Sequence, residues 1–240
     1  MSYLFNTFLY QPIINILVLL YNSVALGDFG VAIIMLTVMV RLALYPMYHK
    51  MLHQQTLMQK LRPEMKKIQD EYKDDKEKQT KLLLELYREH KIKPFHSFLV
   101  LLIQLPILWA LFRAFTNTLN GSVSNLLYSF ISAPEAFNPI FLGILNLNER
   151  NVPLIILTAI VQFFQMKISS TINKPAEGQK SPMPSGNIMG GFIAVFTVFI
   201  LWSLPSAVAL YWLTSTLFSL GQQFVCNKTI KDAELKGNNR

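Results

Sequence analysis

The chain has 240 residues, of which 52% are hydrophobic and only 15% are charged. Soluble domains carry about 25% charged residues, so this composition is typical of a membrane protein. The formal net charge is +8 and Cys226 is the single cysteine, which excludes an internal disulfide and a metal site built from several cysteines. The positive charge lies in particular loops, so we expect no nucleic-acid binding.

The segment 1–28 is apolar but interrupted by polar residues, and it contains no Lys or Arg. Beyond Pro12 its large apolar side chains recur with the spacing of a helix. They are Ile13, Leu17, Leu20, Tyr21 and Val24. We predict an amphipathic helix that lies in the extracytoplasmic membrane interface. The alternative is a sixth membrane span.

Five longer apolar runs follow, and each predicts a transmembrane helix. They cover residues 29–49, 95–117, 152–169, 188–203 and 206–226. The fourth run would be roughly 24 Å long at about 1.5 Å per residue. Since the hydrocarbon core is about 30 Å thick, this span should thin the bilayer or end below its outer face. The sequence therefore predicts an all-α membrane protein with five transmembrane helices.

The connections between these runs differ in charge. The segment 50–94 carries 12 Lys or Arg and 8 Asp or Glu, whereas Arg150 is the one basic residue of 118–151. The loop 170–187 adds two lysines, and the short tail 227–240 adds four basic residues. The positive-inside rule places these basic segments in the cytoplasm, with the N-terminus outside and the C-terminus inside. This topology needs an odd number of spans, which agrees with five.

The segment 50–94 is predicted to form a cytoplasmic hairpin of two helices. One helical stripe of apolar side chains ends at Tyr72, charged residues 73–75 form a turn, and a second stripe includes Tyr87. The stripes would close the hairpin on itself, and the alternative is that they dock a partner or the incoming substrate. Because the pair has few core residues, we expect it to move relative to the spans.

Arg41 lies inside the first apolar run. An arginine at the centre of a membrane helix costs about 2.5 to 3.5 kcal/mol on insertion scales. Such a residue should face protein or a water-filled cavity, and it marks a functional site by default. The alternative is a side chain that snorkels to the cytoplasmic surface. Thr37 precedes Arg41 by one helical turn and shares its face.

Other polar and aromatic side chains fall within the remaining predicted spans. They include Gln104, Gln162, Gln165, Tyr211, Trp212, Thr214, Ser215, Thr216 and Ser219. Taken alone, each such side chain more often forms a hydrogen bond between helices than marks a functional site. No Asp or Glu falls within the predicted spans, so the polar set and its one central cation together predict a hydrated intramembrane pocket that water or an incoming anion would fill.

Several function classes are disfavoured by what the spans contain. An intramembrane enzyme needs a nucleophile with a base, or paired carboxylates, and no Asp, Glu or His lies mid-span. His49 and His53 lack further ligands for a metal site, and no Walker A motif is present, so we expect no cofactor. A small anion transporter or channel with Arg41 as its anion site is the main alternative, although no internal repeat supports it. A structural scaffold, which would tolerate Arg41→Ala, is a further alternative.

Three stretches together resemble the YidC/Oxa/Albino family of membrane protein insertases. They are TVMVRLALYP at 37–46, KIKPFHSFLVLLIQLPILWALFRAF at 91–115 and FTVFILWSLPSAVALYW at 196–212. The spacing between the stretches agrees with the family as well, and the resemblance covers nearly the whole chain. It implies five core spans, a cytoplasmic helical hairpin and a groove that is open to the cytoplasm and to lipid but closed outside.

The resemblance places the family's groove arginine on Arg41, groove-lining polar positions on Thr37 and Gln104, and an aromatic groove position on Trp212. From the polar residues of the spans, we add Tyr211, Ser215 and Gln165 to the predicted substrate groove. No member of this set is expected to be catalytic.

The resemblance also implies a function. The protein would be an insertase or chaperone that assists insertion and folding of short integral membrane proteins without ATP hydrolysis. Its partners would be newly made membrane proteins and membrane lipids, with the Sec translocon and the ribosome as further candidates. Since no Arg- and Ser-rich transit segment precedes the first span, we expect a multi-pass protein of a bacterial plasma membrane.

Overall fold

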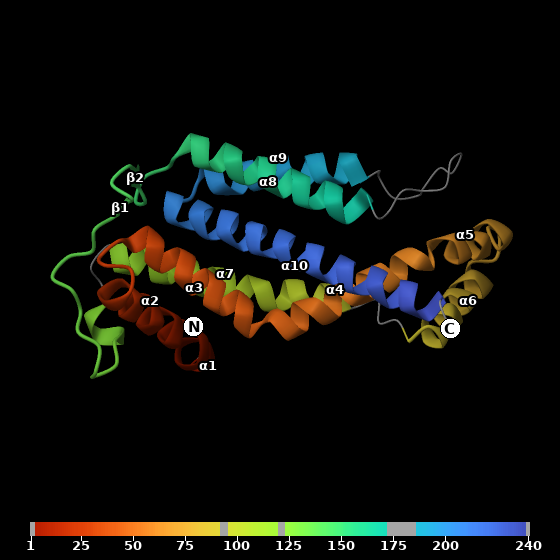
Figure 1. Ribbon diagram of the computed structural model, residues 1–240, viewed down its shortest axis with the longest axis horizontal. Helices are drawn as coiled ribbons and strands as arrows, with labels where there is room; N and C mark the ends of the chain where they lie inside the picture. Colours follow the sequence, from red (N-terminus) through yellow and green to blue (C-terminus); the bar gives the residue numbers. More distant parts are fainter. Residues whose placement is uncertain (1–2, 92–95, 120–122, 172–185, 239–240) are drawn as a thin grey trace.

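Long helices run side by side along most of the molecule in the computed structural model (Figure 1), which describes residues 3–91, 96–119, 123–171 and 186–238. The elements are α1 (Tyr3–Phe5), the π-helix η1 (Asn6–Tyr10), α2 (Gln11–Ser23), α3 (Phe29–Ala43), α4 (Tyr45–Lys60), α5 (Arg62–Glu71), α6 (Lys76–Glu89), α7 (His96–Leu119), the 3-10 helix η2 (Ser124–Leu126), β1 (Ile140–Phe141), β2 (Leu145–Asn146), α8 (Val152–Thr171), α9 (Gly186–Trp202) and α10 (Ser206–Asn238). The all-α prediction thus misses one short antiparallel β-hairpin, β1–β2.

The bundle core is apolar at the end that carries the β-hairpin. Helices α2, α3, α7 and α10 meet there, and their fully buried side chains include Leu17, Phe29 and Phe115. Phe29 packs edge-on against Phe115, with 6.2 Å between ring centroids. Leu147 adds a fully buried side chain from the loop that follows the hairpin. This end is therefore closed by tightly packed hydrophobic side chains.

The core becomes polar toward the other end of the bundle. On α3 the last buried residue is Thr37, and Met39 and Leu42 are exposed. On α10 a buried apolar stretch at 207–211 gives way to buried polar side chains. These are Ser215, Thr216, Gln222 and Gln223. Since buried polar groups need hydrogen-bond partners, the part of α10 from Ser215 onward is suited to a polar interior.

Asp28 ties the β-hairpin to the start of α3. Its Oδ1 accepts a hydrogen bond from the Val31 backbone N–H at 3.0 Å, which caps the helix. Its Oδ2 accepts from the Leu142 backbone N–H at 2.7 Å. Gly30 allows the close approach, because a Cβ there would lie 2.2 Å from the Phe141 ring. One carboxylate and one glycine thus fix β1 against α3.

Helix α2 is anchored into the same end rather than lying apart from the bundle. It packs against α3 and α7, and Ile14, Leu17 and Val18 are fully buried. The buried amide of Asn15 donates to the Leu126 carbonyl at 3.0 Å and accepts from the Tyr128 N–H at 2.7 Å. Of the apolar stripe predicted from the sequence, Ile13, Leu17, Leu20 and Tyr21 are buried against protein, whereas Val24, just beyond the end of the helix, is exposed.

The first predicted span, 29–49, is not one straight helix. It is divided into α3 and α4, which are bent by 61° at a break next to Leu44. Pro46 explains the break, because its ring crowds the carbonyl four residues earlier and it has no N–H to donate. Helix α4 then continues to Lys60, so the predicted boundary at residue 50 falls inside a helix.

The charged segment after this bend is helical and projects from the bundle (Figure 1). Its first arm is interrupted at Leu61, where α4 ends and α5 begins with Pro63 in its first turn. Leu61 and Leu86 form a small buried cluster between α5 and α6, with Tyr87 packed against it. Asp75 caps α6 by accepting from the Lys78 N–H at 2.9 Å. The hairpin therefore has its own small core.

The other helices follow the predicted runs within a few residues, except that α10 extends through the predicted tail to Asn238. Elements α1, η1 and α2 run on without a break over Tyr3–Ser23, and this is the one continuous helix among the described residues that is long and apolar enough to cross a membrane. The bent pair α3–α4 passes the same test when taken together, and Val152–Ile168 is a shorter apolar helix. The span count and the interfacial placement of α2 stay predictions, and the sixth-span alternative stays open.

Candidate functional site

Arg41 lies in the last turn of α3, immediately before the bend. Its Nε and Nη2 both donate to the Ser215 hydroxyl oxygen on α10, with 2.8 Å between Nε and Oγ. On its other side, the guanidinium carbon lies 4.7 Å from the centroid of the Tyr48 ring on α4. Three helices therefore meet at one half-buried cation.

The third guanidinium nitrogen of Arg41, Nη1, is buried and has no hydrogen-bond partner. The groups that contact the cation, the Ser215 hydroxyl and the Tyr48 ring, are both neutral. No ion pair to Arg41 is formed by the described residues. A buried polar group without a partner costs about 1 to 3 kcal/mol, and more when it is charged. The site therefore has an unused donor that is suited to an anion or to water.

A second polar contact joins α10 to α8. The Trp212 indole Nε1 and the Thr216 hydroxyl both donate to Gln162 Oε1, at 3.3 and 3.1 Å. These residues lie one helical turn apart on α10, so one glutamine connects both. The Gln222 amide, further along α10, donates to the Tyr45 backbone carbonyl at 3.2 Å. Polar side chains of α10 thus contact both α8 and the start of α4.

The predicted groove residues are only partly brought together. Arg41 and Ser215 bond directly. Thr37 is buried, but its hydroxyl donates to the Ile33 carbonyl of its own helix. Tyr211 is buried in the apolar half, 6.5 Å from the Phe115 ring, and Trp212 turns toward α8. The remaining two predicted residues are Gln165, which is half-buried without a hydrogen bond among the described residues, and Gln104, whose side chain lies outside the described part of α7.

Sequence reasoning missed Tyr48 and did not select Gln162. Tyr48 follows Arg41 by seven residues, which is two turns along a continuous helix, so a shared face was a usable signal. It was weak because tyrosine is common near membrane interfaces. Gln162 was one of several polar residues in its run, and only the packing of α8 on α10 distinguishes it from Gln165.

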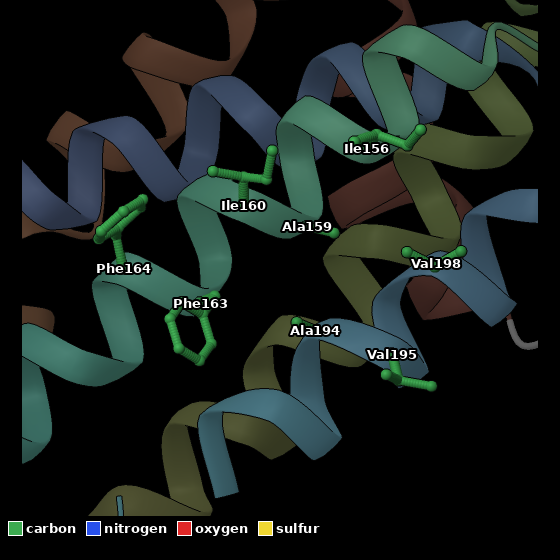
Figure 2. A pocket seen from close by; sticks show the side chains of 8 residues that line it. All are labelled: Ile156, Ala159, Ile160, Phe163, Phe164, Ala194, Val195 and Val198. Carbon is green, nitrogen blue, oxygen red and sulfur yellow. The ribbon is translucent and has the colours of Figure 1, made fainter. Parts of the chain in front are cut away.

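An apolar hollow lies between α8 and α9 on the outside of the bundle (Figure 2). It has a volume of about 410 Å³ and is lined by eight apolar side chains from these two helices. The small side chains of Ala159 and Ala194 leave room for the hollow, and Phe163, Phe164 and Val195 line it as well. Phe164 and Val195 are also largely exposed. This surface is suited to contact with hydrocarbon.

Comparison with known proteins agrees with this architecture. The model of the 60Kd inner membrane protein family matches residues 20–234, and the chain belongs to this family. It is 31% identical over 224 residues to the membrane protein insertase YidC of Fusobacterium nucleatum, covering 92% of this chain and 98% of that protein. It is also 31% identical over 228 residues to the membrane protein insertase YidC of Pelobacter propionicus, covering 94% of this chain.

The chain spans 40% of the length of the Pelobacter relative, and several other relatives are similarly longer. Among solved structures it resembles an active YidC insertase crystal structure with the first transmembrane domain resolved, at 27% identity and a TM-score of 0.62. That match covers 88% of this chain and 45% of the other. The resemblance found in the three sequence stretches is confirmed.

Proposed function

We propose that this chain is a membrane insertase, which assists the insertion and folding of short integral membrane proteins through a hydrated intramembrane groove. The observation that carries the proposal is the unpartnered Nη1 of Arg41, beside buried polar side chains of α10. Such a cation would attract an acidic segment of an incoming protein. The names of the relatives support the same activity.

The proposed topology has five spans, an N-terminus outside and a C-terminus in the cytoplasm, with α1–α2 in the outer interface. The distribution of basic residues supports it. The β-hairpin and the charged α5–α6 hairpin also lie at opposite ends of the bundle (Figure 1), as this topology requires. The apolar, closed end would then face outward and the polar end would face the cytoplasm, so an incoming chain would enter from the inside.

The energy for insertion would come from the substrate, without ATP. About 20 apolar residues release roughly 6 to 12 kcal/mol on entering lipid, at about 0.3 to 0.6 kcal/mol each. The barrier is the polar tail, which must cross the hydrocarbon. A hydrated groove that reaches part of the way, with a thinner bilayer beside the short helix α9 (Gly186–Trp202), would shorten that crossing.

Arg41 would contribute by attracting the acidic tail of the substrate. Two opposite charges about 4 Å apart interact by roughly 4 kcal/mol at an effective dielectric of about 20. This energy is large enough to recruit an acidic tail and small enough to release it. The apolar faces of α7 and α9, together with the hollow between α8 and α9, would then guide the substrate helix sideways into lipid. Newly made membrane proteins and lipids are the proposed partners, with the Sec translocon and the ribosome as further candidates.

The test is insertion of a short single-span protein with an acidic tail into proteoliposomes, scored by protease protection. Empty vesicles, the wild type, Arg41→Ala and Arg41→Lys are compared. Arg150→Ala is the matched control, because it removes one exposed positive charge from the outer loop. We expect wild type, Arg41→Lys and Arg150→Ala to insert the substrate and Arg41→Ala to lose most activity. Insertion no better than in empty vesicles would contradict the insertase proposal, and full activity of Arg41→Ala would contradict the attraction model.

A further inference from the structure

We infer that Ser215 and Tyr48 are positioning residues, which hold the Arg41 guanidinium so that Nη1 is the donor offered to a substrate carboxylate. This inference rests on the proposed function, because it concerns how the same cation is presented. It assigns roles to a hydroxyl on α10 and a ring on α4 that contact Arg41 but do not themselves carry charge.

The hydrogen bonds divide the guanidinium into a used and an unused part. Arginine has five N–H groups in a rigid planar fork. The Ser215 oxygen accepts from Nε and from Nη2, so it occupies the edge of the fork that those two nitrogens share. The ring of Tyr48 lies over the same group at 4.7 Å. Nη1, which neither residue engages by a hydrogen bond, is buried without a partner, so a ligand would bond to it after displacing the side chains that cover it.

The chemistry of the two holding groups supports this division. A carboxylate in place of Ser215 would fix the arginine equally well, but it would also neutralise its charge. A hydroxyl and an aromatic face orient the cation while leaving its charge available. The substrate group that such a site would recognise is therefore an anion, and for a protein tail this means an Asp or Glu carboxylate.

Positioning matters here because Arg41 lies at the α3–α4 bend. A long arginine side chain loses rotamer freedom when it binds, and holding it in advance reduces that loss. Ser215 contacts it from α10 and Tyr48 contacts it from the far side of the bend. Both residues are nine-tenths or more buried, at 4% and 7% exposure, so neither contact is a solvated surface pair.

The competing explanation is that Ser215 is simply a small residue at a helix interface. The two explanations differ in the Arg41→Lys background, since a lysine has no Nε and Nη2 pair for the hydroxyl to hold. A packing role would give the same loss in both backgrounds. A positioning role would give a loss with arginine and almost none with lysine.

The experiment measures the ratio of insertion rates for an acidic-tailed substrate and its neutral twin, in which Asp and Glu become Asn and Gln. The variants are Ser215→Ala, Ser215→Thr, Tyr48→Leu and Tyr48→Phe, with Ser215→Ala also placed in the Arg41→Lys background. Ser219→Ala is the matched control, because that hydroxyl lies one turn along α10 and donates to the Ser215 carbonyl rather than contacting Arg41. Thermal unfolding of each purified variant identifies those that fold.

We expect Ser215→Ala to lower the ratio by about tenfold, the size expected for hydrogen bonds to a charged group. Tyr48→Leu should lower it by a smaller factor, while Ser215→Thr, Tyr48→Phe and Ser219→Ala keep it. An unchanged ratio in Ser215→Ala, or an equal loss in the lysine background, would overturn the inference and leave the proposed function intact. Arg41→Ala is measured alongside, and a ratio that it does not change would overturn the inference and the attraction model. Insertion by the wild type no better than in empty vesicles would overturn the proposed function itself.

Discussion

Asp28 makes two separable contributions to the closed end of the bundle, and substitutions can measure each. Its Oδ1 caps α3 through the Val31 N–H, and its Oδ2 holds the β-hairpin through the Leu142 N–H. Asp28→Ala removes both contacts. Asp28→Asn removes one, because a side-chain amide offers a single acceptor oxygen and asparagine caps a helix about as well as aspartate.

The structure sets the size of the expected losses. A helix cap contributes about 1 kcal/mol, with a range of roughly 0.5 to 2 kcal/mol. The bond to Leu142 joins a carboxylate to a backbone N–H that is exposed enough to take water instead. We therefore assign that bond about 1 kcal/mol, near the low end for a charged group. Asp28→Ala should lower the free energy of unfolding by about 2 kcal/mol, which is roughly 4 to 8 °C in Tm. Asp28→Asn should lower it by about half as much.

The assay is thermal unfolding of the detergent-solubilised protein followed by circular dichroism, with protease cleavage of the loop 123–151 as a second readout. Asp75→Ala is the control, because Asp75 caps α6 with the same geometry but lies in the hairpin outside the bundle. It should leave the main transition unchanged. A Tm of Asp28→Asn equal to wild type, or loop cleavage that Asp28→Ala does not accelerate, would refute the assignment of the hairpin bond.

Three further predictions concern packing, buried polarity and pH. Gly30→Ala should lower the free energy of unfolding by about 1 to 3 kcal/mol, because its Cβ would lie 2.2 Å from Phe141. Chemical unfolding of the double variant should show that Phe141→Ala offsets part of this loss. Asn15→Ala should lower the free energy of unfolding by about 1 to 3 kcal/mol and loosen the loop around Tyr128, because the Tyr128 backbone N–H loses its acceptor. Hydrogen exchange of the Tyr128 amide measures this. Burial raises the pKa of Tyr87 above its usual 10.0. The α5–α6 hairpin should therefore be fully stable below about pH 10 and lose stability as the pH rises through the raised pKa. Limited proteolysis at increasing pH measures this loss.

Each of these three has an outcome that would contradict it. Gly30→Ala with wild-type stability would mean that the β-hairpin does not rest on α3. Equal exchange of the Tyr128 amide in wild type and Asn15→Ala would remove the role given to that side chain. The alkaline loosening of the hairpin should be weaker in Tyr87→Phe, and an identical pH profile would assign it to other groups.

The apolar runs predicted the helix positions well because a span needs a continuous stretch of hydrophobic residues, and that is a local property. The bend at Leu44 is also local in cause, since Pro46 produces it. It was not predicted because proline is compatible with the first turn of a helix as well as with a break. The β-hairpin left little trace in the sequence, because each of its strands has only two residues.

The site shows where sequence reasoning ends. Arg41 was identified from sequence because a charge inside an apolar run is expensive wherever the helices go. Ser215 was one of several hydroxyls on the same helix, and hydropathy does not distinguish them. Thr37 shares a helix face with Arg41, yet its hydroxyl bonds to its own helix. Helical spacing gives the face of a residue, but it does not give the partner that fills the facing position.

The sequence by itself determined the helical class, the approximate helix positions, the charged hairpin and the unusual arginine, because each follows from composition or local periodicity. The tertiary structure alone decided that α10 brings Ser215 to Arg41, that the bend brings Tyr48 over it, and that Nη1 is left without a partner. These contacts join residues up to 174 positions apart. They depend on the rotation of one helix against another, which is set by the packing of the whole core.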